Sequence, residues 1–294
     1  MNRLRVTRPS EEVRQRCAGK LRRGAVSLLR LVFLAALSYV LLNPVFIMLS
    51  DSLKSTVDLI DPTVLWIPKN LNLSSFPEAF KTMDYPTSLM NTLLFEVLSG
   101  VIEVLSCAVI AYGLSRFEFK LKKFLMVFLV LTILVPDGML LLPRVVHYRH
   151  LDVIGLLDGI RQLTGVDLRP NLIDSPLAFY LPAMLGVGLK GGLFIFIYIQ
   201  FFKGLPRELE DAAWIDGAGP LKTFFRIIIP SSGVVILTVF LLSVVFHWND
   251  YWYALMYTDA NRPLAYVVRN ISQYIFLRFG TIPTSDARYV GITM

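Results

Sequence analysis

Residues 206–230 read PRELEDAAWIDGAGPLKTFFRIIIP and separate two apolar stretches that are each long enough to cross a membrane. The segment begins with a proline and several acids, as the start of a helix does. Small residues follow at Ala212, Ala213 and Gly217, and their spacing predicts that Ala213 and Gly217 share one helical face. Such a face lets the backbone of another protein approach closely. We therefore expect a short helix that docks on a partner, with an ordinary amphipathic loop as the alternative.

The composition indicates a membrane protein. Hydrophobic residues make up 55% of the 294 residues and charged residues only 17%, whereas soluble domains carry about a quarter charged residues. Residues 31–50 and 227–249 contain no Asp, Glu, Lys or Arg, and each meets the length of roughly 20 residues that a helix needs to cross the hydrocarbon core. The sequence therefore predicts an all-α, polytopic membrane protein.

Polar loops separate the predicted membrane-spanning helices. Five spans are expected, at residues 28–49, 88–114, 124–143, 176–202 and 232–256. The second contains Glu96 and Glu103 and the fourth contains Lys190, which makes these two spans less apolar than the others. We expect a membrane domain over residues 28–294, preceded by a basic tail at residues 1–27. The quoted segment then belongs to a loop at residues 203–231, between the fourth and fifth spans.

Basic residues predict the orientation of the chain. The tail before the first span carries eight Lys and Arg, and 17 fall on the predicted inner side against 11 on the outer side. Because cytoplasmic loops are enriched in Lys and Arg, we expect the N-terminus in the cytoplasm. The same tail accounts for the net charge of +7, and no nucleic-acid partner is expected. The apolar stretch after the tail is too long for a signal peptide and lacks a small-x-small cleavage site, so we expect a retained anchor.

No pattern in the sequence predicts covalent chemistry. The two cysteines and three histidines are scattered, without the spacing of a metal site or a disulfide framework. No nucleophile–base arrangement is evident, so an enzyme is the least favoured class. The phosphate-binding pattern G-x-x-x-x-G-K-[ST] is absent, so ATP, if it is used, would bind to another chain.

The loop at 206–230 resembles the signature of the integral-membrane subunits of ATP-binding-cassette (ABC) importers. The family pattern is Glu-Ala-Ala, three residues, Gly, nine residues, Ile, one residue and Leu-Pro; here it reads Asp211-Ala212-Ala213, Gly217, Ile227 and Ile229-Pro230. Asp replaces Glu and Ile replaces Leu, and both spacings are kept. The resemblance implies a coupling helix that lies in a groove of a cytosolic ATPase. The residues expected to make this contact are Glu210, Asp211, Ala212, Ala213, Asp216, Gly217, Ile227 and Pro230.

The resemblance extends over residues 27–294. Asn91-Thr92, residues 111–117 and Trp248-Asn249-Asp250 are similar to residues of maltose-type carbohydrate permeases, and residues 246–252 look most like the branch associated with complex or uronic oligosaccharides. This likeness implies the type I transmembrane fold of ABC importers in a prokaryotic inner membrane. It also implies the partners: a second permease forming a heterodimer, two ATPase subunits that bind ATP and magnesium, and an extracytoplasmic sugar-binding protein.

One feature departs from those relatives. They have a sixth span directly after a segment that resembles residues 286–294, where this sequence stops. We expect that the sequence is truncated, because residues 291–294 look like the start of an apolar segment. The alternative is a permease that lacks the sixth helix.

A sugar path needs aromatic faces for the rings and polar groups for the hydroxyls. We expect such a path at Trp248, Asn249, Asp250, Tyr251 and Trp252, together with Glu103. The alternative for the aromatic cluster is an interfacial belt, where Trp and Tyr are enriched by solvation alone. Ionisable residues inside spans usually face a cavity or a partner, but they can equally satisfy internal hydrogen bonds.

The sequence as a whole predicts the permease subunit of an ATP-driven importer of di- or oligosaccharides. A permease of the same kind for a non-sugar solute is the nearest alternative. An ion-gradient-driven transporter that uses Glu96, Glu103, Asp137 and Lys190 is a second alternative. Such transporters are built from internal repeats, and none is visible in the sequence.

Overall fold

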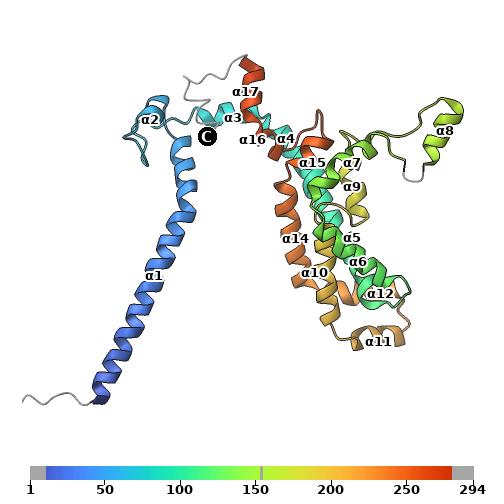
Figure 1. Cartoon of the computed structure of the whole chain (residues 1–294), viewed down its shortest axis with the longest axis horizontal. Helices are drawn as coiled ribbons and strands as arrows, with labels where there is room; N and C mark the ends of the chain where they lie inside the picture. The colour runs from blue at the N-terminus through green and yellow to red at the C-terminus, as the bar shows by residue number, and fades with distance from the viewer. Residues whose placement is uncertain (1–10, 153–154, 280–294) are drawn as a thin grey trace, which may run out of the picture. The chain divides into compact units, whose positions relative to one another are not determined.

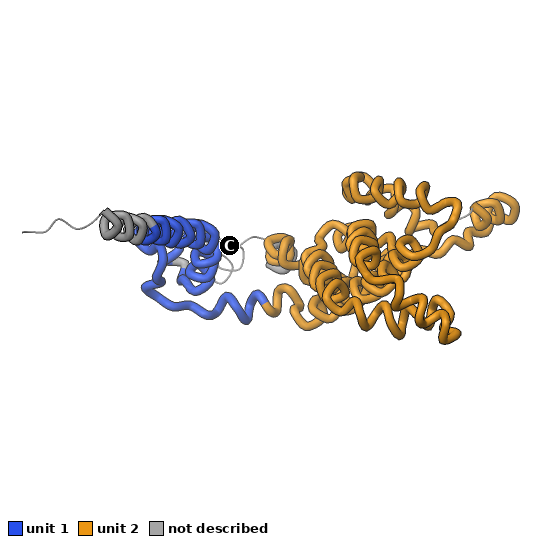
Figure 2. Tube along the Cα trace, turned by 90° about the horizontal axis from the view of Figure 1, so that it is seen from below, with its two compact units in different colours: residues 1–79, 281–294 blue, residues 80–280 orange. Residues whose placement is uncertain are grey.

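The computed structural model describes residues 11–152 and 155–279. Within these ranges the secondary structure is helical, apart from one isolated antiparallel bridge between Lys54 and Leu71 (Figure 1). The chain divides into two compact units, one within residues 1–79 and the other within residues 80–280 (Figure 2). The predicted all-α architecture is confirmed for the described residues.

The first unit is dominated by one long helix. Helix α1 runs from Glu11 to Ser52, and its part from Arg23 to Ser52 is long and apolar enough to cross a membrane. None of its most apolar stretch is buried within the chain, which suits a helix surrounded by lipid or by another subunit. The predicted span at residues 28–49 lies within this helix.

Short helices and turns follow α1. Helix α2 (Thr56–Ile60) begins after Ser55, whose hydroxyl caps it by accepting a hydrogen bond from the Asp58 N–H, and α3 (Ser75–Thr82) follows a loop. The buried Asp58 carboxylate accepts two hydrogen bonds from Asn70, which fixes that loop.

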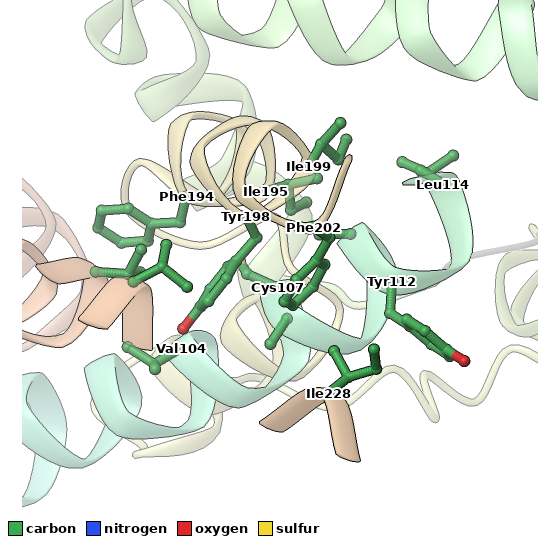
Figure 3. Packing of buried hydrophobic residues seen from close by; sticks show 14 of the residues in the cluster. Val104, Cys107, Tyr112, Leu114, Phe194, Ile195, Tyr198, Ile199, Phe202 and Ile228 are labelled. Atoms are coloured by element: carbon green, nitrogen blue, oxygen red, sulfur yellow. The ribbon is translucent and has the colours of Figure 1, made fainter. Parts of the chain in front are cut away.

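Helix α5 (Leu98–Arg116) is the centre of the second unit. It packs against α9 (Leu177–Met184), α10 (Gly191–Gly204) and α14 (Gly233–Trp248). Small residues on α5 permit this close approach: a Cβ at Gly100 would lie 2.8 Å from the Ser243 hydroxyl of α14. Figure 3 shows the resulting core, in which Cys107 of α5 packs beside Tyr198 and Phe202 of α10, all three fully buried.

The predicted second span, residues 88–114, lies within a continuous helical segment from Tyr85 to Arg116 that is long and apolar enough to cross a membrane. Three elements compose it: α4 (Tyr85–Asn91), a π-helical stretch η1 (Thr92–Val97) and α5. Local π-helix often marks a functional position, because the wider turn displaces side chains from regular α-helical spacing. Glu96 lies in this stretch and is 1% exposed.

The predicted third span at residues 124–143 is sharply bent. Helix α6 (Lys122–Leu134) and α7 (Asp137–Arg149) cover this region, but the chain bends by 103° between them. The bend falls at Val135 and Pro136. Pro136 has no N–H to continue the helix and biases Val135 toward extended backbone, which ends α6.

The predicted fourth and fifth spans are also interrupted. Residues 185–190 form a turn between α9 and α10, in which Gly186 and Lys190 have φ of 69° and 66°. Helix α14 ends at Trp248, and α15 (Trp252–Tyr257) begins after a break. Hydropathy summed over a whole stretch does not detect such turns, because their few polar residues, such as Lys190 and Asn249, are averaged with apolar neighbours.

By length and composition, two helices of the described part can each cross a membrane. The number rises to four if each of two sharply bent helix pairs counts as one span, and α10 is a shorter apolar helix. The remaining helices are α8 (Leu156–Thr164), α11 (Glu208–Ile215), α12 (Pro220–Thr223), η2 (Phe224–Ile228), α13 (Ile229–Ser231), α16 (Leu264–Arg269) and α17 (Ile271–Phe279). The segment assigned to a sixth span begins outside the described residues, so that prediction is not addressed.

Candidate functional site

The loop at 206–230 folds into a short helix with a fixed exit. Three acids in the first turn of α11 stabilise its N-terminus through the helix dipole. At the other end, the Ala218 N–H bonds to the Ala213 carbonyl and the Gly217 N–H bonds to the Trp214 carbonyl. These two bonds form a Schellman motif, which requires left-handed backbone at Gly217 (φ 78°).

This ending contradicts one expectation from the sequence. Ala213 and Gly217 do not share a helical face, because α11 stops at Ile215 and Gly217 turns the chain away. Ala213 is buried at 6% exposure, whereas Gly217 is exposed, and nothing lies within 4 Å of the position its Cβ would take. The Ala-Ala pair is therefore split, with Ala212 outward and Ala213 inward.

The loop presents an outward surface that combines acidic, small and large apolar residues. Five of the eight predicted contact residues are exposed, namely Asp211, Ala212, Asp216, Gly217 and Pro230, whereas Ile227 is half-buried and Glu210 and Ala213 are buried. Large apolar side chains are exposed among them: Leu209, Trp214, Ile215, Leu221 and Phe225. We call this the outer face of the loop. Large apolar residues gathered in one exposed loop in this way are a feature of protein-binding sites.

The inner side of the loop is fixed by an ion pair that the sequence analysis did not predict. The Arg116 Nε lies 2.7 Å from Glu210 Oε1, and both side chains are 4% exposed. A second guanidinium nitrogen of Arg116 donates a hydrogen bond to the Leu205 carbonyl at 3.0 Å. The sequence shows a basic residue at the end of the second predicted span and an acid at the start of the loop, but nothing in it specifies that the two pair.

Burial sets the electrostatics of Glu210. Desolvation raises the pKa of its carboxyl above the ordinary value, and the nearby guanidinium groups of Arg116 and Arg207 oppose that rise. The ion pair thus compensates for a carboxylate that burial alone would disfavour.

A large open cavity lies by α15, toward the end of the unit opposite α11 (Figure 1). Its volume is about 760 Å³, and its lining includes Asn249, Asp250, Tyr251 and Trp252. Four of the six predicted path residues therefore meet at one cavity. Trp248 is 42% exposed but does not line it, and Glu103 is buried elsewhere.

The aromatic part of this cavity is held by specific contacts. Asp250 Oδ1 accepts hydrogen bonds from the N–H groups of Trp252 and Tyr253, which caps the start of α15. The Arg269 guanidinium stands 4.3 Å from the centre of the Tyr251 ring and 5.7 Å from that of Trp252. Aromatic faces and polar edges combined in this way can stack on sugar rings and bond to hydroxyls.

Lys190 and Asp137 form an ion pair at the boundary of two cavities. The Lys190 Nζ lies 2.6 Å from Asp137 Oδ2, and both side chains are partly exposed. They line the cavity just described and a second one of about 450 Å³, which also contacts the turn between α9 and α10. Lys190 thus pairs with a carboxylate at the edge of both cavities.

Glu103 lies in a tight polar contact at the centre of the unit. Its Oε2 is 3.4 Å from His247 Nε2, and its carboxylate packs on the backbone of Gly188 and Gly191. Neither Glu103 oxygen makes a hydrogen bond to the described part of the chain. Glu103 is therefore not in the large cavity predicted as the path.

A small cavity of about 20 Å³ lies nearby, lined by residues that include Glu96, Arg144, His247 and Asp250. Its volume matches about one water molecule. Within residues 11–152 and 155–279, no cluster of three or more His, Cys, Asp or Glu has an arrangement that could hold a metal ion.

Comparison with known proteins decides the family. The family model described as "Binding-protein-dependent transport system inner membrane component" matches residues 104–290. The chain belongs to this family. Its members are membrane components of ABC importers rather than enzymes, so the expectation of a non-enzymatic transport subunit is confirmed.

Individual relatives agree with this assignment. The chain is 30% identical over 216 residues to the melibiose/raffinose/stachyose import permease MelC of Bacillus subtilis, covering 73% of this chain and 69% of MelC. It is 30% identical over 218 residues to the trehalose transport permease SugB of Mycobacterium tuberculosis, covering 74% and 70%. A bacterial ABC transporter involved in alginate import has a chain with the same fold, with a TM-score of 0.65 at 17% identity, covering 98% of this chain and 92% of that one.

Proposed function

We propose that this permease imports di- or oligosaccharides and is driven by a cytosolic ATPase that docks on the outer face of the loop at 206–230. The observation that carries the proposal is the division of α11 into two sides. Glu210 and Ala213 face the bundle, while Asp211, Trp214 and Ile215 face outward. A loop that served only as a connection would not expose tryptophan and isoleucine, at 45% and 86%, beside a conformationally fixed glycine turn.

Docking on this face provides a mechanism for coupling. The ATPase, which binds ATP and magnesium, moves as nucleotide binds and is hydrolysed. A rigid helix in its groove would follow that motion and tilt the spans, because the chain enters α11 directly from α10. The path would then open alternately to the two sides of the membrane. No covalent step takes place in this permease.

The cavity lined by residues 249–252 is proposed as part of the sugar path. It has the aromatic faces of Tyr251 and Trp252 and the polar groups of Asn249 and Lys190, and its volume of about 760 Å³ is large enough for an oligosaccharide unit. A second permease would complete the path as a heterodimer partner, and an extracytoplasmic binding protein would deliver the sugar.

Relatives support a saccharide cargo. MelC and SugB are named for melibiose, raffinose, stachyose and trehalose. A second cargo class has one specific observation in its favour: a permease of Pectobacterium atrosepticum named for sn-glycerol-3-phosphate is 29% identical over 181 residues. A polyol phosphate is therefore the alternative substrate.

The proposed arrangement in the membrane follows the distribution of charge. Residues 1–27 would form a basic cytoplasmic tail, and residues 28–294 would form the membrane domain of an inner-membrane permease. This orientation places the outer face of the loop in the cytoplasm, where an ATPase can reach it.

The first experiment is to purify the solubilised chain with its native membrane neighbours and identify them by mass spectrometry. We expect an ATPase to be recovered, and we expect Asp211→Lys to lose it, because this exposed acid lies on the outer face. Glu208→Lys is the matched control, since Glu208 is an exposed acid of the same helix outside the predicted contact set. Uptake of melibiose or trehalose into vesicles without ATP would overturn the proposal in favour of an ion-driven carrier.

Two substitutions of Gly217 give a second test of docking on the loop. Asn tolerates left-handed backbone, whereas a β-branched residue does not. Gly217→Asn should therefore keep the turn and Gly217→Val should distort it, with membrane insertion intact in both. We expect Val to uncouple uptake from ATP hydrolysis and Asn to retain more coupling. Normal uptake by the Val variant would contradict docking at this turn.

A further inference from the structure

One side chain, Arg116, joins three elements at the loop end of the second unit. It is the last residue of α5, its guanidinium is 2.7 Å from Glu210 on α11, and it donates to the carbonyl of Leu205, the residue that ends α10. Arg116 and Glu210 are 4% exposed, so solvent screens this contact little. The ends of α5 and α10 and the start of α11 therefore meet at a single guanidinium group.

Little else on α11 reaches the bundle. Of its eight residues only Glu210 and Ala213 are buried, and alanine has one methyl group to pack. Glu210 is thus the only long side chain that α11 turns inward. The ion pair with Arg116 is therefore a buried side-chain link between α11 and the ends of α5 and α10, and the Tyr112 hydroxyl of α5 lies near the same carboxylate.

Helix α5 connects this link to the interior of the unit. It extends without a break from Leu98 to Arg116, and α10 packs along it with fully buried aromatic residues (Figure 3). Further along α5, the Glu103 carboxylate lies against the turn that precedes α10 and near His247 of α14. A displacement applied at Arg116 is therefore applied to the helix on which these interior contacts depend.

We propose that Arg116 is a positioning residue that locks α11 to α5 and α10 through Glu210, so that motion of a partner on the loop is transferred to these two helices. This inference rests on the proposed docking of an ATPase, and it assigns the transmission step to a contact on the inner side of α11. Binding of the ATPase uses the opposite side. Loss of the ion pair should therefore separate binding from transmission.

The test uses the complex with its ATPase and a reporter in the path. Asn249→Cys, in a chain that also carries Cys17→Ser, is labelled with a membrane-impermeant maleimide with and without a non-hydrolysable ATP analogue; Cys107 is buried. We expect the nucleotide to change the labelling rate by about tenfold in the parent chain, a typical size for coupling between sites. Arg116→Gln and Glu210→Gln should abolish the change while the ATPase still co-purifies.

Exchanging the two charges tests whether the link depends on the ion pair or only on side-chain packing. The double variant Arg116→Glu, Glu210→Arg should restore part of the nucleotide response that both single charge-removal variants lose, because it keeps the opposite charges but not the hydrogen bond to the Leu205 carbonyl. Arg116→Lys should give an intermediate response. Lys203→Gln and Glu208→Gln are matched controls, because these charged residues lie on α10 and α11 but are exposed. A full response in Arg116→Gln, or no recovery in the exchange variant when it inserts normally, would overturn the proposal.

A measurement on the chain without ATPase distinguishes failure of this link from failure of docking. Trypsin cuts after exposed Arg207 and Lys222, on either side of α11. If Arg116 holds the loop in place, Arg116→Gln should raise the cleavage rate about tenfold, because cleavage follows local opening. An unchanged rate overturns the link whatever the ATPase does, whereas a raised rate without any bound ATPase supports the link and rejects the docking.

Discussion

Two buried glutamates, one at each half of the second unit, are held in different ways. Glu210 at the loop end is 2.7 Å from the Arg116 guanidinium, and that cation is itself tied to the Leu205 carbonyl. Glu103 in the interior is 0% exposed, and its nearest basic group is the His247 ring at 3.4 Å. The loop glutamate is fixed by a strong cation, whereas the interior glutamate lies against backbone and an imidazole. The comparison suggests a rigid connection at the loop and a contact that can rearrange inside the membrane.

Removing the cation from the fixed pair should have the largest effect on stability. Arg116→Met leaves Glu210 buried and uncompensated, and such changes cost about 3–5 kcal/mol. Replacing both residues, Arg116→Met with Glu210→Met, should be close to neutral because no charge is left unpaired. Thermal unfolding of the detergent-solubilised chain measures both. Equal destabilisation by the single and double variants would show that the charge of Glu210 contributes nothing.

Substitution of Gly191, one of the two glycines against which Glu103 packs, should have the second largest effect on stability. A Cβ at Gly191 would lie 2.4 Å from the Gly186 carbonyl oxygen and 2.7 Å from Glu103 Oε1, so Gly191→Ala overfills the turn. We expect a loss of about 1–3 kcal/mol in unfolding free energy. Gly113→Ala on α5 is the control, since a Cβ there meets nothing within 4 Å, and it should stabilise by about 0.5–1 kcal/mol. The comparison loses its basis if both variants behave alike.

Neutralising each glutamate in turn tests the contrast directly. Glu210→Gln removes a charge that burial disfavours and the Arg116 guanidinium compensates, so the two effects partly cancel and the unfolding free energy should change by less than in Arg116→Met. Glu103→Gln keeps the shape of a side chain whose oxygens make no hydrogen bond to the described part of the chain, so its stability should change by less. Chemical or thermal denaturation of both variants under one condition gives the change in unfolding free energy for each. A larger change in Glu103→Gln than in Glu210→Gln would contradict the prediction.

The pH dependence of Glu210 should be the smallest effect. Burial raises the pKa of its carboxyl in the folded chain, so the folded state retains the proton more strongly than the unfolded state. This contribution to stability is complete below the ordinary glutamate pKa of about 4.3 and is lost as the pH rises toward the folded value. Glu210→Gln should lack that component. Parallel pH titrations of thermal stability in the parent and the variant would reveal it as a difference, and superimposable curves would exclude it.

Local sequence patterns predicted much of the fold and part of the site. The loop signature depends on spacing within 25 residues, and the structure confirms a short helix at its start and exposes most of the residues proposed for contact. The first two predicted spans, at residues 28–49 and 88–114, could be predicted because each lies in a continuous apolar helix, which hydropathy detects. Four of the six proposed path residues meet at one cavity because they are nearly consecutive in sequence.

The failures share a physical origin in contacts between distant residues and in turns made of small residues. Arg116 and Glu210 belong to separate helices, and nothing in either local sequence specifies their pairing. Hydropathy does not give the size of the bends at Pro136 and at residues 185–190, because it averages over the whole stretch. Ala213 was predicted to share a face with Gly217 because the two are four residues apart. That spacing places two residues on one face only if the helix continues past Ile215, and it does not.

The turn at residues 185–190 has a consequence for hydration. Lipid cannot bond to the N–H and C=O groups of irregular backbone, so such backbone is tolerated at membrane depth only inside protein or beside water. Leu185, Gly186 and Gly188 of this turn line the cavity of about 450 Å³, together with the partly exposed Lys190–Asp137 pair. The polar edge of this cavity, formed by the turn and the ion pair, should therefore be hydrated when no solute occupies it. A sugar entering it would exchange hydroxyl contacts with water for equivalent contacts with the turn, and would not have to shed its hydration shell in an apolar medium.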